Sequence, residues 1–236
     1  MSPKDSCPVV HVVAAAVIDA AGRVLIAQRP EGKHLAGGWE FPGGKLEPGE
    51  ERLAGLAREL CEELGITIIG MPRPLIRVRH AYPAREVLLD IWVVRRYGGE
   101  LRGLDGQALR WCTQDELATA DLLPADKPIV AALRLPERLT EVSSRHYTIG
   151  EAGSAEIRPS ALAINNFSLH GVFCWNVDEA VGAVRVGADF LVMREALPPK
   201  ELADLCRLAP VPVFARRIEL EEAWATGASG LNQIIG

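Results

Sequence analysis

Cysteine is scarce and scattered in this chain, which has five cysteines, at positions 7, 61, 112, 174 and 206, and no Cys-x-x-Cys pair. An odd number of cysteines at this spacing suits neither a disulfide framework nor a zinc site. The thiols are therefore expected to be reduced, as they are in the cytoplasm.

Long apolar runs and basic clusters are lacking as well. The apolar stretch at residues 9–18 is too short to cross a bilayer, contains His11, and lacks the basic leader and cleavage site of a signal peptide. It is expected to be a strand, and no membrane partner is expected. The formal net charge is -5 without a lysine or arginine block, so a nucleic-acid polymer is not expected as a partner. A small phosphorylated substrate carried with its metal remains compatible.

Length and texture indicate two domains. The chain has 236 residues, of which 48% are hydrophobic, and this length lies between one large domain and two small ones. Residues 136–159 are polar and irregular, and the pattern of strands and helices differs on either side of them. We expect an α/β chain with domains at residues 1–135 and 160–236 and a linker at 136–159.

The expected elements support this division. In the first domain, strands are expected at residues 9–18, 23–28, 75–80, 87–95 and 108–112, and helices at 51–64, 114–118 and 128–133. Mixed strands with helices outside them fit an α/β/α sandwich. In the second domain, strands at 170–174, 189–193, 211–215 and 230–235 alternate with helices at 178–186, 199–208 and 220–226. This alternation predicts parallel βα units.

The helix expected at residues 51–64 carries an unusual cluster of acid. Glu59, Glu62 and Glu63 fall on one arc of the helix, to one side of its apolar stripe. Like charges at these spacings destabilise an isolated helix by a few tenths of a kcal/mol per pair, and a divalent cation would offset that repulsion. Carboxylate oxygens suit Mg²⁺ or Mn²⁺. The alternative is a solvated acidic face, but Gly44 and Gly65 flank the run at a spacing that favours the metal.

That spacing resembles the Nudix box at every fixed position of residues 44–66. Residues 38–45, residues 103–107 with Trp111, and residues 123–129 further resemble the MutT type of Nudix hydrolase, so the resemblance covers most of residues 9–135. It implies a Nudix sandwich that hydrolyses a nucleoside triphosphate, 8-oxo-dGTP above all, to the monophosphate and pyrophosphate. Water would attack a phosphorus with the help of Mg²⁺, with Mn²⁺ as an alternative.

The same resemblance implies roles for individual residues. Metal ligands and catalytic groups are expected among Glu59, Glu62 and Glu63, with Glu59 as the leading general base, and the Gly44 carbonyl and Asp105 as further ligands. Glu50 is expected to join a second metal or to orient the ligands, and Arg58 to brace the glutamates. Substrate is expected to contact Arg29, Glu40 and Asp126.

Several of these residues have a second interpretation. Asp105 is also a natural Asp-Gly turn residue, and Arg29 a solvated strand end. Trp39, Trp92 and Trp111 could stack on a base, but a core role is expected for at least two of them. Asp126 stands where the MutT type has an asparagine that reads the base. Either Asp126 stays protonated in a dry pocket, or base discrimination is weaker or built differently.

Residues 187–193, 210–215 and 226–230 resemble the last strands and helices of thiamine phosphate synthase, a TIM barrel. The resemblance covers only the rear of such a barrel, and Arg216-Arg217 stands where that family has a glycine pair. We therefore expect a partial TIM-barrel-like remnant without synthase activity. Four parallel strands would leave two open edges, and a homodimer through this domain is one way to cover them.

Three functions follow from these observations. The first is a Nudix hydrolase that removes 8-oxo-dGTP from the nucleotide pool. The second is a Nudix hydrolase of another nucleotide or of a thiamine-related diphosphate, in view of the fusion. The third is a non-enzymatic sensor that binds a phosphorylated ligand through the second domain, and the intact glutamate set argues against it.

Overall fold

The structure is a computed structural model of the chain. It describes residues 9–33, 35–83, 85–135, 138–143, 146–149, 153–158, 161–164, 167–169, 171–185, 188, 190–209 and 211–234. The chain divides into two compact units, one made of Met1–Arg73 and Val78–Val130, the other of Pro74–Arg77 and Ala131–Gly236. Each unit is described separately below.

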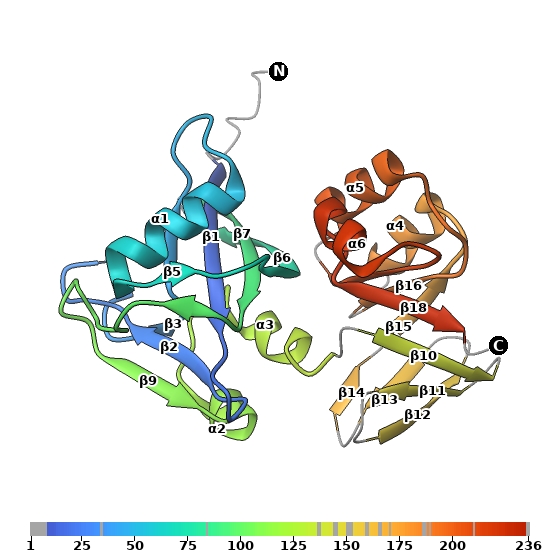
Figure 1. The fold of residues 1–236 in the computed structure, drawn as a ribbon, viewed down its shortest axis with the longest axis horizontal. Helices are drawn as coiled ribbons and strands as arrows, with labels where there is room; N and C mark the ends of the chain where they lie inside the picture. Colours follow the sequence, from blue (N-terminus) through green and yellow to red (C-terminus); the bar gives the residue numbers. More distant parts are fainter. Residues whose placement is uncertain are drawn as a thin grey trace. The chain divides into compact units, whose positions relative to one another are not determined.

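The first unit is built around a mixed sheet with the strand order β4-β1-β7-β6 (Figure 1). Strand β1 (Val9–Val17) runs parallel to β7 (Arg85–Val94), with Val13 opposite Asp90, and antiparallel to β4 (Gly43–Lys45). Strand β6 (Arg73–Tyr82) forms the other edge. A second sheet has the order β3-β2-β9, from Trp39–Glu40, Val24–Gln28 and Leu109–Cys112, and β5 (Thr67–Ile68) pairs with β8 (Tyr97–Gly98).

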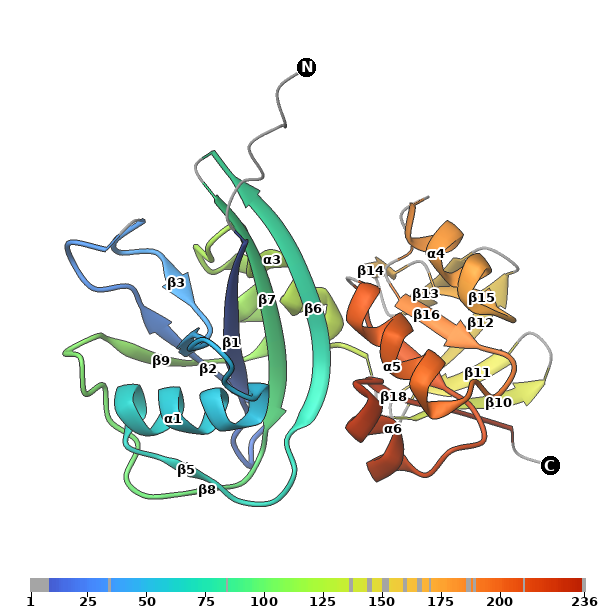
Figure 2. The same ribbon diagram turned by 90° about the horizontal axis from the view of Figure 1, so that it is seen from above.

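Helix α1 (Arg52–Leu64) lies beside these strands (Figure 2), and the buried residues of its apolar stripe belong to the same core cluster as residues of β1, β2 and β7. Leu56, Leu60 and Leu64 are fully buried against a cluster that includes Val13 and Leu25. Burying such a side chain contributes about 1.5–3 kcal/mol, so this stripe fixes which face of the helix is left outside the core. The glutamates lie on the remaining faces, and the helix therefore carries them to a defined place beside β4.

The first unit confirms the α/β fold with a mixed sheet that the sequence predicts. The helix ends at Gly65, whose φ of 69° is the left-handed cap expected there. Helices α2 (Gln114–Thr119) and α3 (Lys127–Ala132) agree with prediction within a residue or two. The short strands β3, β4, β5 and β8 were not predicted, because two or three residues carry too little periodicity to be recognised.

None of the three tryptophans considered for base stacking lines the pocket described below. Trp92 is 4% exposed and belongs to the core cluster, and Trp111 packs against that cluster from outside. Trp39 is partly buried in β3. The expected core role therefore fits at least Trp92 and Trp111. None of the three tryptophans is placed to stack on a base in this pocket.

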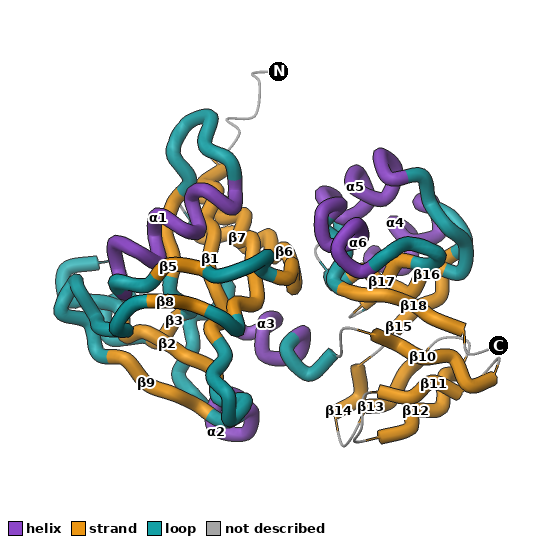
Figure 3. The backbone as a smooth tube through the Cα atoms, viewed as in Figure 1, coloured by secondary structure: helices purple, strands orange, loops and turns teal. Residues whose placement is uncertain are grey.

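The second unit contains four parallel strands in sequential order, β15-β16-β17-β18, with a helix between each pair (Figure 3). The strands are Gly171–Cys174, Phe190–Met193, Val213–Ala215 and Gly230–Ile234, and the helices are α4 (Val177–Arg185), α5 (Pro199–Leu208) and α6 (Leu220–Thr226). The expected parallel βα units are confirmed. Their core includes Leu191, Leu202 and Val213. Their resemblance to a barrel of thiamine phosphate synthase stays a prediction.

The segment at 138–169 covers most of the linker expected at 136–159 and the first residues of the domain expected from 160. Its described parts form strands β10 (Arg138–Ser143), β11 (His146–Ile149), β12 (Gly153–Arg158), β13 (Ala161–Ile164) and β14 (Phe167–Leu169), paired antiparallel in sequence. These strands are short, and β10 and β12 are mostly polar, which made them hard to recognise, although β10 and β11 contain the Thr, Val, Tyr and Ile that favour strands. Strand β10 also pairs in parallel with β18. One of the two expected open edges is thus covered within the chain, and the homodimer stays a prediction.

No helix in the described part of the chain is long and apolar enough to cross a membrane. The four cysteines that the structure describes are all free thiols, as expected, and Cys7 lies outside the described residues.

Candidate active site

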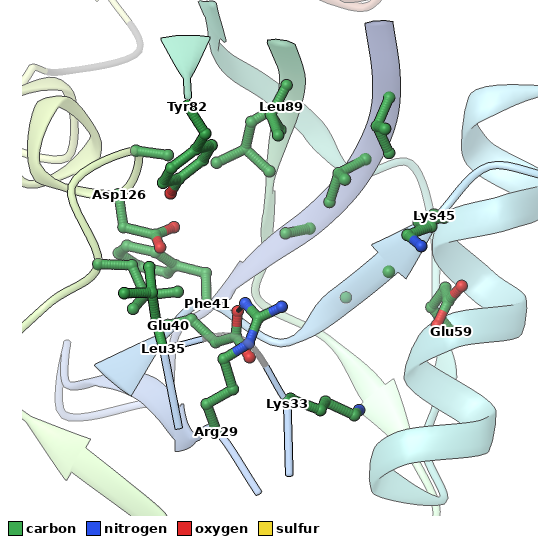
Figure 4. Close-up of a pocket in the computed structure, with 18 of the residues that line it drawn as sticks. Arg29, Lys33, Leu35, Glu40, Phe41, Lys45, Glu59, Tyr82, Leu89 and Asp126 are labelled. Atoms are coloured by element: carbon green, nitrogen blue, oxygen red, sulfur yellow. Dashed lines mark hydrogen bonds and ion pairs between the residues drawn. The ribbon is translucent and has the colours of Figure 1, made fainter. Parts of the chain in front are cut away.

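A pocket of about 540 Å³ opens in the first unit between α1, β4, β1 and the loop before α3 (Figure 4). Its walls contain apolar residues such as Val12, Leu89 and Phe41 and a set of charged residues at two ends. Glu59 of α1 lies at one end and Asp126 at the other (Figure 4), and Glu63 lies near Glu59, since they contact the adjacent residues Gly43 and Gly44. A pocket with apolar walls and few convergent polar groups is the usual form of a small-molecule site.

At the acidic end, two glycines of β4 let its neighbours approach closely, α1 at Gly44 and β1 at Gly43. A Cβ added at Gly44 would overlap the Glu59 carboxylate, and one added at Gly43, whose φ is 150°, would overlap the Val13 carbonyl. The Gly43 N–H donates to Glu63 Oε2 at 3.1 Å. Glycine is therefore required at both positions to bring the two carboxylates against the strand.

Arg58 holds the neighbouring carboxylates from outside the pocket. Its Nη1 donates to Glu59 Oε1 at 2.9 Å and to Glu62 Oε2 at 3.1 Å. Its Nε and Nη2 donate to the two oxygens of Glu50 at 2.8 and 2.9 Å, and Nη2 also to the Lys45 carbonyl at 3.1 Å. These hydrogen bonds to Arg58 lower the pKa of Glu50 to about 2. This is the geometry of a bracing residue, since Arg58 itself does not line the pocket.

Burial has the opposite effect on Glu63. It raises the pKa of the Glu63 carboxyl to about 7, and the nearby charges of Glu59 and Glu40 add to the rise, while the Gly43 hydrogen bond and Lys33 oppose it. The pocket therefore holds an acid whose charge is poorly compensated by the protein. A cation at this end would compensate it.

The structure does not bring the three box glutamates together. Glu59 and Glu63 line the pocket, whereas the Glu62 side chain is 60% exposed and lies outside it. Among the described residues no group of three or more His, Cys, Asp or Glu side chains has the spacing of metal ligands. Contacts within the protein account for this, because Arg58 holds Glu59 and Glu62 and the Gly43 N–H holds Glu63.

The donor set nevertheless fits a hard divalent cation. Glu59 and Glu63 present carboxylate oxygens to the same end of the pocket, beside the backbone of Gly43 and Gly44. Mg²⁺ is commonly held by one or two carboxylates together with waters and substrate phosphates, so two pocket carboxylates suffice. The uncompensated acid of Glu63 points to the same ligand class.

At the opposite end, Arg29 Nη1 donates to Glu40 Oε2 at 2.6 Å, and both residues line the pocket. Arg29 is therefore partly buried in an ion pair at the pocket wall and is not a solvated strand end, and its expected contact with substrate stays a prediction. Asp126 is 4% exposed beside them. Burial raises the pKa of Asp126 to about 8 and the Glu40 charge adds to the rise, whereas a hydrogen bond from Phe41 N–H and the Arg29 charge oppose it. Asp126 is thus a neutral acid at pH 7.

Asp105 lies away from the pocket walls. Its carboxylate is 48% exposed and its Oδ2 is 3.8 Å from Lys33 Nζ. The turn at residues 103–106 is closed by a hydrogen bond from Gly106 N–H to the Gly103 carbonyl at 3.2 Å. The turn interpretation of Asp105 therefore fits the geometry, and its expected part as a metal ligand stays a prediction.

Several pocket residues escaped the sequence analysis. Phe41 and Tyr82 supply aromatic surface, a part for which the tryptophans were considered, and Lys33 and Arg85 supply positive charge. Tyr82 and Arg85 lie at the two ends of the β6–β7 connection. The strand pattern predicts where this connection lies in the sequence, but not that its residues line the pocket. Lys33 lies in a loop without periodicity. Only Phe41 had a signal, as part of the segment at 38–45.

Comparisons with known proteins agree with this geometry. A family model described as "NUDIX domain" matches residues 13–132. The chain is 40% identical over 121 residues to the "CTP pyrophosphohydrolase" of Escherichia coli K12, covering 51% of this chain and 88% of that protein. It is 36% identical over 114 residues to the "8-oxo-dGTP diphosphatase" of the same strain, covering 47% and 85%. It is 42% identical over 91 residues to the "8-oxo-dGTP diphosphatase" of Proteus vulgaris, covering 39% and 80%.

Proposed function

This chain belongs to the Nudix family and is a Nudix hydrolase, and from that premise we propose that it is a Mg²⁺-dependent nucleoside triphosphate pyrophosphohydrolase. The reaction adds water across a phosphoanhydride and releases a nucleoside monophosphate and pyrophosphate. The acidic end of the pocket supports this proposal, because it places two carboxylates where the phosphates of a nucleotide would meet them.

Glu59 and Glu63 would hold the cation, with Mn²⁺ as a possible substitute. When bound, the cation offsets charge on the phosphoryl oxygens and lowers the pKa of water. Glu59 accepts the proton of the attacking water through a carboxylate that Arg58 keeps oriented. Glu50 orients Arg58 in turn through two hydrogen bonds. Glu62 takes part only if it leaves Arg58, since its carboxylate lies outside the pocket.

We propose 8-oxo-dGTP as the leading substrate, which would place the protein in sanitation of the nucleotide pool. The observation that carries this choice is the burial of Asp126 in the pocket, which raises its pKa to about 8 and so favours the neutral acid at pH 7. A carboxylic acid offers one O–H donor and one acceptor, like the amide found at this position in the MutT type. Oxidised guanine presents a donor at N7 and an acceptor at O6, and the acid complements both.

The same pair of groups also complements cytosine, which presents a donor at N4 and an acceptor at N3. The relative named CTP pyrophosphohydrolase, 40% identical over 121 residues, supports cytidine triphosphate as the second candidate. Unoxidised guanine has two acceptors, N7 and O6, on the edge where 8-oxoguanine has a donor. The neutral Asp126 can make two hydrogen bonds with 8-oxoguanine or with cytosine, but only one with the N7–O6 edge of guanine. Asp126 alone therefore favours 8-oxo-dGTP and CTP over dGTP.

A substrate panel tests the proposal. The purified chain with Mg²⁺ is assayed on 8-oxo-dGTP, dGTP, CTP, dCTP and thiamine diphosphate, with pyrophosphate and phosphate release followed separately. We expect pyrophosphate as the product, with the highest kcat/KM for 8-oxo-dGTP or CTP. Phosphate release alone, or a preference for thiamine diphosphate, would replace this function with that of a different diphosphate hydrolase.

For the second unit we propose a remnant of a thiamine phosphate synthase-like barrel. The sequential parallel order of β15 to β18 supports this assignment, since consecutive strands of such a barrel are neighbours. The arginines at 216 and 217 stand where close backbone approach to a phosphate needs glycine. We expect no thiamine phosphate from its two precursors in protein free of the host synthase, and measurable turnover there would contradict the remnant.

A further inference from the structure

Lys33 lies in the loop that joins β2 to β3, and its side chain lines the pocket while remaining 51% exposed. The base of this loop is held by a pair of hydrogen bonds, from Arg29 N–H to the Gly38 carbonyl and from Gly37 N–H to the Arg29 carbonyl, both at 2.9 Å. In Figure 4, Lys33 lies between Arg29 and Glu59. The loop therefore carries a positive charge to the middle of the pocket.

The surroundings of Lys33 are acidic in two directions. Glu40, at the base-reading end, and Glu63, at the acidic end, line the same pocket as Lys33. Its ammonium is thus within electrostatic reach of both ends. A nucleotide whose base meets Asp126 and whose outer phosphates meet Glu59 would pass its phosphate chain through this region.

Asp105 faces Lys33 from a loop that is tied to the catalytic helix. Asp105 N–H donates to Gln107 Oε1 at 2.9 Å, and Gln107 Nε2 donates to the Glu63 carbonyl at 3.1 Å. Leu104 N–H donates to the same carbonyl at 2.9 Å. The backbone of Asp105 is therefore held close to the turn of α1 that carries Glu63, and its Oδ2 lies 3.8 Å from Lys33 Nζ.

We propose that Lys33 binds a phosphate of the substrate and that Asp105 positions its ammonium, instead of serving as a metal ligand. The inference rests on the proposed function. An ammonium is a compact charge that suits phosphate oxygens. An exposed ion pair such as Lys33–Asp105 is weak, so phosphate displaces the carboxylate at little cost. Asp105 then keeps the flexible lysine near the pocket in the free protein.

The binding experiment compares Lys33→Met, Lys33→Arg and, as a matched control, Lys200→Met, which removes an exposed lysine from the second unit. Calorimetry measures the affinity of each protein for two ligands without turnover. One is the α,β-methylene analogue of CTP, which is not cleaved between these phosphates, and the other is cytidine, which has no phosphate. We expect Lys33→Met to lower the affinity for the analogue about tenfold, as the loss of a hydrogen bond to a charged group does. The affinity of Lys33→Met for cytidine should stay within about twofold of the wild-type value. The affinities of Lys33→Arg and Lys200→Met for the analogue should also stay within about twofold of wild type.

A kinetic experiment separates the two assignments of Asp105. If Asp105 positions Lys33, Asp105→Asn raises KM by a few-fold, has no further effect in the Lys33→Met background, and leaves the Mg²⁺ concentration for half-maximal rate unchanged. If Asp105 were a metal ligand, Asp105→Asn would instead raise the Mg²⁺ concentration for half-maximal rate in both backgrounds. That result would overturn the role given to Asp105.

Equal affinity of Lys33→Met and wild type for the methylene analogue would overturn the role given to Lys33. This outcome differs from failure of the proposed function. If wild type hydrolyses no nucleoside triphosphate, the proposed function fails, while the affinity of the analogue still decides whether Lys33 binds phosphate.

Discussion

Gly44 of β4 and Glu59 of α1 are in direct contact, with the carboxylate lying in the space that a side chain at position 44 would fill. The strand is thus open at one residue to admit a carboxylate from the helix. Arg58 holds the same carboxylate from the other side, at 2.9 Å. Two independent contacts therefore fix the proposed general base.

Gly44→Ala should expel Glu59 from this space. A displacement of about 1 Å at a reacting group can cost roughly 10²-fold in rate, and we expect a loss of that order in kcat. The matched control is Gly182→Ala on α4, where an added Cβ meets nothing within 4 Å. The control should keep full activity and gain about 0.5–1 kcal/mol in the free energy of unfolding, because alanine favours a helix interior. Equal kcat in the two variants would contradict the fixed position of Glu59.

The three box glutamates should differ in importance. Glu59→Gln and Glu63→Gln remove the two carboxylates that line the pocket, and we expect kcat to fall by about 10²-fold or more in each, as for other electrostatic groups at reacting centres. Glu62→Gln removes a carboxylate that is 60% exposed, and its loss should be at least about tenfold smaller. An equal loss in all three would mean that Glu62 leaves Arg58 when the metal binds.

Metal binding by the same residues can be measured without substrate. Mg²⁺ that binds only the folded chain stabilises it, by about 2.7 kcal/mol at a concentration 100 times its Kd. We expect Mg²⁺ to raise the Tm of wild type and of Glu62→Gln, and to have little effect on Glu59→Gln or Glu63→Gln. Removal of the metal by a chelator should reverse the shift and abolish hydrolysis.

Position 126 shows where sequence reasoning reached its limit. The motif indicates that this residue meets the base, but whether Asp126 is charged depends on burial and on Glu40, which is distant in sequence and meets it only in the fold. Glu62 shows the same limit, since helical spacing puts it on the arc of Glu59 and Glu63 but does not reveal that Arg58 turns it outward. The α1 stripe and its Gly65 cap were predictable, because periodicity and chain reversal are local properties. The strands at 138–169 were not predictable, because strand formation there depends on pairing with neighbouring strands, such as β11 and β18 beside β10.

Asp126 should give the activity a pH dependence of definite sign. The pKa of about 8 means that the acid keeps its O–H donor at neutral pH and loses it as pH rises further. Asp126→Asn keeps a donor at every pH, so the ratio of kcat/KM for 8-oxo-dGTP, variant over wild type, should rise by roughly tenfold between pH 7 and 9. Taking the ratio cancels the titration of groups common to both proteins, such as Glu63. A ratio that stays flat would show that Asp126 does not read the base as an acid.

The same residue predicts a change in stability with pH. Unfolded Asp126 ionises near pH 3.9, whereas the folded residue holds its proton until about pH 8. Between these values the unfolded chain binds fewer protons at this site, so rising pH lowers the free energy of unfolding. The Tm of Asp126→Asn minus that of wild type should therefore increase from pH 4 to pH 8. Asp121→Asn, at an exposed position nearby, is the control and should show no such trend.

The division into two units predicts that hydrolysis survives removal of residues 136–236, which form most of the second unit. The pocket residues lie between positions 10 and 126, and the core beneath α1 and the core of the βα units are formed by separate sets of residues. A chain ending after Leu135 retains β1 to α3, and we expect kcat/KM for 8-oxo-dGTP and CTP within about threefold of the full chain, a change of less than 1 kcal/mol. We also expect lower solubility, measured by light scattering alongside the rates. The full chain carrying Glu63→Gln is the control for contaminating hydrolases. A soluble, folded 1–135 fragment without activity would show that the second unit contributes to catalysis, and the remnant proposed for it would then need a role in the reaction.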